Sequence, residues 1–369
     1  MIKELNIFSS IRLRQIINDL KRRPEDAAKD LKIKTSTFYK YLKNNKKIDE
    51  DFVKRAVNIW PVNINDFINP NYNKSLSYKI MRVQDSLKTK RIMKRGKKDY
   101  YEYRDTVMDR NAPFRPEWIR ELVYVKSNSP KEKDLKWNRG HLLHQITYFV
   151  GKVNFYYIDS NNKKKTAIMN TGDSMYIAPY VPHTFASRDK NCKGHIIAIT
   201  FSDKITNDIQ NEISKFSKRK IKEIIFKKSI KTHKKVSVKK FKETKKSNIN
   251  KAIQINRLAN SKIIPTTNFL QIEIKKNNNL KFSNSYHQYI YILKNNSRLK
   301  IEDKLIKFRE GDTLYLRPFT KYKMPLKNTK ILVAQVQSVF SNDVIEQLHH
   351  IGANNFKRLL KDNAQWFKK

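Results

Sequence analysis

The first seventy residues have the hydrophobic spacing of short amphipathic helices. Apolar side chains recur at the i, i+3, i+4 and i+7 positions of one helical face, at Leu13, Ile16, Ile17 and Leu20. Pro24 suits the first position of a second helix. Two further helices are predicted, one from about Thr35 and one from about Asp49 until Pro61. We therefore predict a helical domain resembling a helix-turn-helix over residues 1–72.

From about Leu122 the pattern changes to short strand-like runs. These runs are rich in β-branched and aromatic residues, as in ITYFVGKVNFYYI (146–158), SMYIAPYV (174–181) and GHIIAITF (194–201). They predict a β-barrel or sandwich. The predicted domains after the helical one are a first barrel over 73–203, a basic helical segment over 204–258, a second barrel over 259–340 and a C-terminal helical tail over 341–369.

The two β-rich blocks repeat each other. The pairs His144-Gln145 and Gly172-Asp173 of the first block have counterparts in the second at His287-Gln288 and Gly311-Asp312. Tyr and Pro follow the Gly-Asp pair at the same spacing in both blocks. The fold class expected is α+β, with a helical domain followed by two related β-barrels, the second degenerate, and a helical segment between them.

Comparing the two copies points to chemistry in the first. Asn284 aligns with His141, and Tyr322 aligns with His183, so only the first barrel has these two imidazoles. An imidazole present in one copy favours a metal site over a packing role, and Gln145 is a candidate third ligand. The alternatives are two unrelated surface or core histidines and a glutamine that only bonds within the sheet.

This ligand set makes a demand on the chain. Residues four apart in a straight strand lie about 13 Å apart. His141 and Gln145 can therefore share an ion only if the chain bends or bulges between them. His144 has the opposite parity in the strand and is expected to point away as a structural histidine.

Composition limits the classes of protein. The 369 residues suffice for several folded units, and the single Cys192 excludes an internal disulfide. No run of about 20 apolar residues is present, so a membrane span is not expected, and the chain is predicted to be cytoplasmic. A net charge of +45 favours an anionic partner. Because lysines occur in every segment, most of this charge indicates a compositional bias rather than a site, and nucleic acid is not the favoured partner.

The segments RGHLLHQITYFVG and GDSMYIAPYVPHTF, between a helix-turn-helix-like domain and a degenerate second barrel, resemble the cupin iron dioxygenases acting on 2-hydroxyethylphosphonate. The resemblance implies two cupin barrels, an Fe(II) cofactor, and 2-hydroxyethylphosphonate and O2 as substrates. It assigns His141 and His183 as metal ligands. The dioxygenases of this family take a Glu six residues before the second His, where this chain has Ile177. The resemblance therefore favours Gln145 as third ligand and the branch that releases methylphosphonate and CO2 or bicarbonate.

The same resemblance suggests residues that contact the substrate. Arg95, Tyr103 and Asn138 match the family's substrate-binding positions, and Lys21 resembles a lysine that closes over the site. It gives Lys21 and Tyr103 catalytic roles as well. A phosphonate dianion suits such cationic and neutral donors. Each residue also has an ordinary interpretation as a solvated cation or a packing or turn residue.

Three rival functions remain open. The first is the family's other branch, which releases hydroxymethylphosphonate and formate. The second is a transcription regulator in which the helical domain binds DNA and a barrel senses a ligand. The third is a zinc-dependent cupin enzyme or isomerase using the same ligands. Oligomeric state is also left open, including whether Lys21 would serve its own chain or a neighbour.

Overall fold

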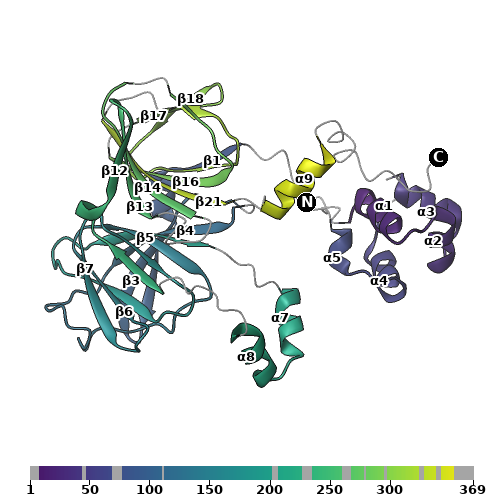
Figure 1. The fold of residues 1–369 in the computed structure, drawn as a ribbon, viewed down its shortest axis with the longest axis horizontal. Helices are drawn as coiled ribbons and strands as arrows, with labels where there is room; N and C mark the ends of the chain where they lie inside the picture. Colours follow the sequence, from purple (N-terminus) through teal and green to yellow (C-terminus); the bar gives the residue numbers. More distant parts are fainter. Residues whose placement is uncertain are drawn as a thin grey trace. The chain divides into compact units, whose positions relative to one another are not determined.

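The fold was analysed in a computed structural model, which describes residues 8–43, 47–68, 77–109, 112–201, 207–226, 235–259, 267–277, 280–294, 297–323, 328–337 and 342–352. The chain divides into two compact units (Figure 1). The helical unit comprises residues 1–75 and 340–369, and the β-rich unit comprises residues 76–339. No helix in these described ranges is long and apolar enough to cross a bilayer.

The N-terminal helices form where the hydrophobic spacing predicts them. They are α1 (Ser10–Asp19), α2 (Pro24–Asp30), α3 (Thr35–Leu42), α4 (Glu50–Ile59) and the short α5 (Ile64–Phe67). Pro24 is the first residue of α2, and the Asp49 carboxylate caps α4 by accepting from the Phe52 amide at 2.8 Å. A shared core that includes Leu13, Phe38 and Val53 holds the helices together. The C-terminal part of this unit contributes α9 (Asn342–Ile351).

The β-rich unit contains two β domains, each made of a seven-stranded antiparallel sheet and a smaller sheet. In the first β domain the sheet order is β11-β8-β5-β10-β4-β3-β2, with β7-β6-β9 opposite. Its strands are β2 (Arg91–Arg95), β3 (Lys98–Asp105), β4 (Phe114–Glu121), β5 (His144–Val150), β6 (Val153–Ile158), β7 (Lys164–Met169), β8 (Ser174–Ile177), β9 (His183–Ser187), β10 (His195–Phe201) and β11 (Val236–Lys239).

The second β domain has the order β1-β19-β16-β21-β14-β13-β12, with β15-β20-β17-β18 as its smaller sheet. Its strands are β1 (Tyr78–Met81), β12 (Lys245–Asn250), β13 (Ile253–Ala259), β14 (Thr267–Ile274), β15 (Lys281–Phe282), β16 (Tyr286–Lys294), β17 (Ser297–Ile301), β18 (Lys304–Phe308), β19 (Thr313–Leu316), β20 (Tyr322–Lys323) and β21 (Thr329–Gln337). Four further elements connect the strands: α6 (Val83–Lys88), α7 (Asn207–Ser214), α8 (Lys218–Phe226) and the 3-10 helix η1 (Phe241–Glu243).

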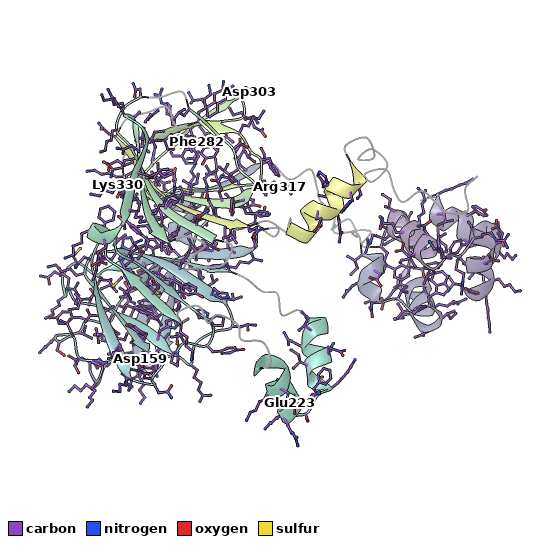
Figure 2. The ribbon with its side chains drawn as sticks, viewed as in Figure 1. Asp159, Glu223, Phe282, Asp303, Arg317 and Lys330 are labelled. Atoms are coloured by element: carbon purple, nitrogen blue, oxygen red, sulfur yellow. The ribbon has the colours of Figure 1, made fainter. Side chains whose placement is uncertain are left out.

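Strand alternation sends side chains into three separate cores, and both β domains are densely filled (Figure 2). One core lies inside the first β domain and includes Phe149 and Ile177, and another fills the second. The third packs the two seven-stranded sheets against each other, with Trp118 and Tyr148 from the first and Tyr291 from the second. Along β5, residue 145 therefore faces the first interior while residue 148 faces the neighbouring domain.

The internal repeat is present, and the two copies exchange a strand. The strand that precedes the first β domain, β1, pairs with β19 of the second, and β11 pairs with β8 of the first. The aspartate of each Gly-Asp pair binds the backbone next to the exchanged strand. Asp312 accepts from the Val83 amide at 2.9 Å, as Asp173 accepts from the Phe241 amide at 2.8 Å.

Two of the predicted boundaries are wrong. The segment expected to be helical over 204–258 is helical only in α7 and α8, and strands begin at Val236. The second β domain begins before residue 259, because β12 and β13 already belong to its large sheet, and β1 joins it from residue 78. The basic, polar composition of this segment hid β12, whose six residues are all exposed and give no hydrophobic alternation.

Candidate metal centre

Three predicted ligands meet inside the first β domain. Gln145 is the second residue of β5, His183 is the first residue of β9, and His141 lies in the irregular segment before β5. The chain therefore bends between His141 and Gln145, and His141 Nε2 lies 3.0 Å from Gln145 Oε1. The ring centroids of His141 and His183 are 5.3 Å apart. The spacing of four residues is thus accommodated by ending the strand, without a bulge.

Backbone carbonyls orient both imidazoles in the same way. His141 Nδ1 lies 2.8 Å from the Leu143 carbonyl oxygen, and His183 Nδ1 lies 2.8 Å from the Val181 carbonyl oxygen. A carbonyl only accepts, so each Nδ1 donates and each Nε2 keeps its lone pair. Metal-bound histidines commonly have this arrangement. Burial, with smaller contributions from His141 and Arg95, lowers the pKa of His183 to about 4, so its ring is neutral.

Gln145 completes a set of neutral donors. Its side-chain Nε2 donates to Thr147 Oγ1 at 2.9 Å, which turns Oε1 toward His141. Oε1 and the His141 Nε2 lone pair are both acceptors, and two acceptors this close repel unless a cation or proton lies beside them. Directly across from Gln145 in β8 is Ile177, which is fully buried. Within the described ranges, no three His, Cys, Asp or Glu side chains gather as a metal-binding group.

Asn138 ties the histidine segments together. Its Oδ1 accepts from the backbone amides of Gly140 and His183, each at 2.9 Å. Its Nδ2 lies 3.1 Å from His183 Nε2, on the side where the three candidate ligands meet. Gly140 has a φ of +81°, and a Cβ there would lie 2.5 Å from the Tyr180 carbonyl carbon, so this turn requires glycine.

Arg95 and Tyr103 come from β2 and β3 of the same domain. The Arg95 guanidinium donates to the Lys136 carbonyl and lies 3.3 Å from Thr184 Oγ1, next to His183 in sequence. Within the described part of the chain, the Tyr103 hydroxyl has no hydrogen-bond partner. Burial, followed by the negative charge of Glu117, raises the pKa of Tyr103 to about 12, so the hydroxyl stays a donor at neutral pH.

Two carboxylates that the sequence patterns did not indicate face the same interior. Glu117 and Glu121 lie on the face of β4 that carries Ile119, a residue of the first core. Burial raises the pKa of Glu117, while Arg91 at 3.6 Å and His141 oppose that effect. Burial also holds the pKa of Glu121 well above its usual value. In FRPEWIRE both acids share the parity of Arg115, opposite to that of Phe114 and Trp118, so the strand pattern gave no signal for them.

The remaining predicted residues fall elsewhere. Lys21 belongs to the helical unit, at the end of α1, where its φ of 55° places it in the left-handed region. His144 points away from the interior, as its parity predicts, and its Nδ1 lies 2.8 Å from the Tyr176 hydroxyl. His287 makes the equivalent contact with Tyr315 at 2.7 Å, which confirms that this histidine is structural in both copies.

The second β domain shows what replaces the candidate ligands. Gln288, the counterpart of Gln145, has its Oε1 within 3.2 Å of the Tyr322 hydroxyl, and Tyr322 is the counterpart of His183. The Asn284 carbonyl accepts from Phe319 as the His141 carbonyl accepts from Tyr180. The backbone is therefore conserved between the copies while the donor set is present in only one.

No family model matches the chain. It is 35% identical to the methylphosphonate synthase of Nitrosopumilus maritimus (strain SCM1), over 95% of this chain and 94% of that protein. A shorter similarity, 30% identity over 104 residues, links it to (S)-2-hydroxypropylphosphonic acid epoxidase of Streptomyces wedmorensis, covering 28% of this chain and half of the epoxidase.

Solved structures show similarity over nearly the whole chain. One is Streptomyces albus HEPD with 2-hydroxyethylphosphonate and Fe(II) bound, with a TM-score of 0.86 and 25% identity, covering 97% of this chain and 98% of that one. A variant of 2-hydroxyethylphosphonate dioxygenase shares the fold at a TM-score of 0.71 and 11% identity, over 97% of this chain and 98% of its own.

Proposed function

The chain belongs to the family of methylphosphonate synthase and 2-hydroxyethylphosphonate dioxygenase, and we propose that it is an iron(II) oxygenase of the methylphosphonate synthase type. It acts on 2-hydroxyethylphosphonate, cleaving the carbon-carbon bond with O2 and releasing methylphosphonate and CO2 or bicarbonate. Its two β domains are cupin barrels, of which the first is catalytic. The observation that carries the proposal is the meeting of two Nδ1-anchored imidazoles with the Gln145 amide oxygen.

His141, Gln145 and His183 hold the iron. Their donor set fits a divalent ion because each imidazole turns its Nε2 lone pair inward and the amide oxygen lies beside one of them. Three protein ligands leave positions for the substrate and O2. Fe(II), when bound, supplies the one-electron chemistry needed to use O2. The backbone bonds to Nδ1 fix both rings before the metal arrives.

The neutrality of Gln145 suits a dianionic substrate. Two imidazoles and one amide leave the full double positive charge of the ion, whereas a carboxylate would cancel part of it. Ile177 lies directly across from Gln145 and is buried, so no carboxylate takes that position. The resemblance, with Gln145 present and Ile177 in place of a carboxylate, favours the methylphosphonate branch over the branch that releases hydroxymethylphosphonate and formate.

Three further side chains bind the phosphonate. Arg95 supplies a guanidinium, Tyr103 a hydroxyl that stays protonated, and Asn138 an amide nitrogen directed at the ligand set. With His183 Nε2 as a metal ligand, Asn138 Nδ2, which lies 3.1 Å from it, would be available to donate to a phosphonate oxygen. By the resemblance, Lys21 supplies a further cation to the substrate of its own chain or of a neighbouring chain.

Anaerobic Fe(II) titration tests this assignment. We expect one equivalent per chain, with loss of tight binding in His141→Ala, Gln145→Ala and His183→Ala. His287→Asn removes a half-buried imidazole from the second β domain and should bind Fe(II) as the natural chain does. O2 uptake should then require both Fe(II) and 2-hydroxyethylphosphonate. Stoichiometric Fe(II) in the His183→Ala chain would exclude this ligand set, and O2-independent turnover with zinc would favour the rival metalloenzyme.

The regulator hypothesis has one observation in its favour, the helical unit with its helix-turn-helix-like order. It requires a defined DNA site bound in a gel-shift assay and no O2 uptake with Fe(II) and substrate. It gives no reason for the three neutral donors in the first β domain.

A further inference from the structure

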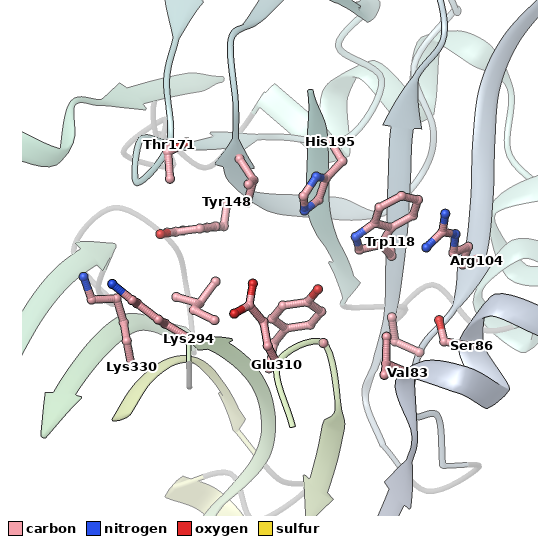
Figure 3. Close-up of a pocket in the computed structure, with 15 residues that line it drawn as sticks. Val83, Ser86, Arg104, Trp118, Tyr148, Thr171, His195, Lys294, Glu310 and Lys330 are labelled. Carbon is pink, nitrogen blue, oxygen red and sulfur yellow. The ribbon is translucent and has the colours of Figure 1, made fainter. Parts of the chain in front are cut away.

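A cavity lies between the two β domains, outside the candidate metal centre. Its volume is about 400 Å³, within the range of small-molecule sites. Tyr148 and His195 line it from the first β domain, and Tyr291, Lys294, Glu310 and Lys330 line it from the second (Figure 3). Tyr148 projects from the outward face of β5, opposite to the inward face that carries Gln145. The cavity is thus separated from the metal ligands by the sheet itself.

The walls of this cavity are built from equivalent positions of the internal repeat. Tyr148 corresponds to Tyr291 in the shared alignment of β5 and β16. His195 and Lys330 occupy matching positions next to the pairs Ile196–Phe149 and Ile331–Ile292. Glu310 takes the place of Thr171 before the Gly-Asp pair.

The two halves differ in charge. Apart from Arg104, the first β domain contributes neutral groups, since Thr171 is uncharged and burial lowers the pKa of His195 to about 4. The second contributes Lys294, Lys330 and Glu310. A packing role alone would not require Lys330 and Glu310 where the first copy has the neutral His195 and Thr171.

Three charged residues of the second β domain line the cavity, namely Lys294, Lys330 and Glu310. Lys294 and Lys330 lie directly opposite each other in β16 and β21, where like charges destabilise a sheet. In the described ranges, neither their ammonium groups nor the Glu310 carboxylate forms an ion pair or hydrogen bond. Arg104, by contrast, is bound to Glu102 and stacks 3.9 Å above Trp118. Among the described residues, the cavity therefore presents two cations and one anion without a protein partner, of which Lys330 is half-buried and Lys294 and Glu310 are exposed.

We propose that this inter-domain cavity binds a small zwitterion, with its oxyanion between Lys294 and Lys330 and its ammonium group against Glu310. Figure 3 shows the two lysine side chains next to each other and the Glu310 carboxylate directed into the cavity between them and Trp118. An oxyanion relieves the repulsion between the opposed lysines. The ammonium of the same molecule neutralises the carboxylate.

Isothermal titration of the Fe(II)-loaded chain under anaerobic conditions tests the proposal. Saturating 2-hydroxyethylphosphonate fills the metal centre and serves as an anion-only competitor at the inter-domain cavity, so tighter binding of a zwitterion in its presence reports the ammonium contact with Glu310. The zwitterionic probes are β-alanine and 2-aminoethylphosphonate, which distinguish a carboxylate from a phosphonate anion. Propionate and ethylphosphonate test the anion alone. We expect one of the zwitterions to bind at least tenfold more tightly than its anion-only counterpart.

Variants locate the site. Lys330→Gln should weaken binding of the zwitterion at least tenfold. Glu310→Gln should weaken the zwitterion to the level of the anion-only probe and leave that probe unchanged. Lys304→Gln changes an exposed lysine of β18 outside the cavity and should match the natural chain. Absence of saturable binding by either zwitterion, or equal binding in the Lys330→Gln and natural chains, would overturn the proposal. Turnover at the metal centre is measured separately, so that failure of the proposed function and failure of this proposal give different results.

Discussion

Asn138 connects the backbone of the metal centre to its ligands. Its Oδ1 accepts from backbone amides, and its Nδ2 lies next to His183, so the two roles can be separated by substitution. Asn138→Asp keeps the acceptor for the Gly140 and His183 amides but replaces the donor near His183 Nε2 with an acceptor. We expect near-normal thermal stability and a KM for 2-hydroxyethylphosphonate raised at least tenfold, because a carboxylate repels the phosphonate. Steady-state O2 uptake measures KM.

The companion variant Asn138→Ala loses both the acceptor for the backbone amides and the donor near His183. It should lower the free energy of unfolding by about 1–3 kcal/mol, since buried amides lose their acceptor. An unchanged KM in Asn138→Asp would show that this side chain only holds the backbone.

Glu121 gives the first β domain a pH-dependent weakness. Its carboxyl is fully buried, and neither oxygen has a hydrogen-bond partner in the structure. Burial raises its folded pKa above the ordinary 4.5, so the folded chain binds the proton more tightly than the unfolded chain does. The stability it contributes is complete below the unfolded pKa and is lost as pH rises through the folded pKa.

We therefore expect Glu121→Gln to stabilise the chain by about 1–3 kcal/mol at pH 7 and to have little effect near pH 4. Urea unfolding at the two pH values measures the difference. Glu243→Gln, at an exposed position, serves as the control. Equal stabilisation by Glu121→Gln at both pH values would contradict a raised pKa of Glu121 in the folded chain.

At this scale the sequence predicted the candidate ligands but not their surroundings. His141 and His183 stood out because the second copy has Asn284 and Tyr322 in their places. That comparison requires only the amino-acid sequence. The acceptor role of Asn138 toward His183, 45 residues away, depends on a tertiary contact. Glu117 and Glu121 were not predicted, because a carboxylate at an inward position only weakens the strand pattern.

Among the elements, the exchanged strands connect the two β domains. Asp312 is 1% exposed and accepts from the Val83 amide at 2.9 Å and from Arg82 at 2.7 Å, which fixes the end of β1. Asp312→Ala should lower the free energy of unfolding by about 2–4 kcal/mol, since it leaves a buried amide and a cation unpaired.

Hydrogen exchange locates the effect of that change. Amides of β1 should exchange faster in Asp312→Ala, whereas Asp173→Ala, its counterpart in the repeat, should affect β11. The same pattern of exchange in both variants would contradict independent anchoring of the two strands.

The sequence predicted which segments repeat, but not which copy each strand joins. Val236–Lys239 and Tyr78–Met81 are four-residue strands, too short to define their partners by hydrophobic pattern. Their pairing is decided by contacts across more than 200 residues in the case of β1 and β19. By contrast, the helices of the helical unit were predicted closely, because their caps and apolar faces are local.

For the whole molecule, the open question is how the helical unit contributes to turnover. Lys21 belongs to that unit, whereas the three candidate ligands belong to the β-rich unit. Lys21→Ala should lower kcat/KM at least tenfold, as expected for a lost charge-assisted contact of about 1.5–3 kcal/mol, and leave Fe(II) affinity unchanged. Lys21→Arg should recover part of the activity.

Mixing Lys21→Ala with His183→Ala chains then identifies which chain the lysine serves. Activity returns only if the lysine of one chain completes the metal centre of another. Full activity in Lys21→Ala would remove this residue from the mechanism.

The net charge of +45 contributes at the same scale through its long-range field. It attracts an anionic substrate without specifying one. Under the proposed function, selectivity for a phosphonate depends on Arg95, Tyr103 and Asn138, which come from three separate segments of the first β domain.

Under the proposed function, two imidazoles and one amide direct O2 chemistry toward methylphosphonate. Phosphorus NMR of a single reaction tests it most directly: the natural chain is loaded anaerobically with Fe(II), given 2-hydroxyethylphosphonate and then O2. We predict one new signal, that of methylphosphonate, absent from the Gln145→Ala chain. A hydroxymethylphosphonate signal, or unchanged substrate with iron fully bound, would contradict the account.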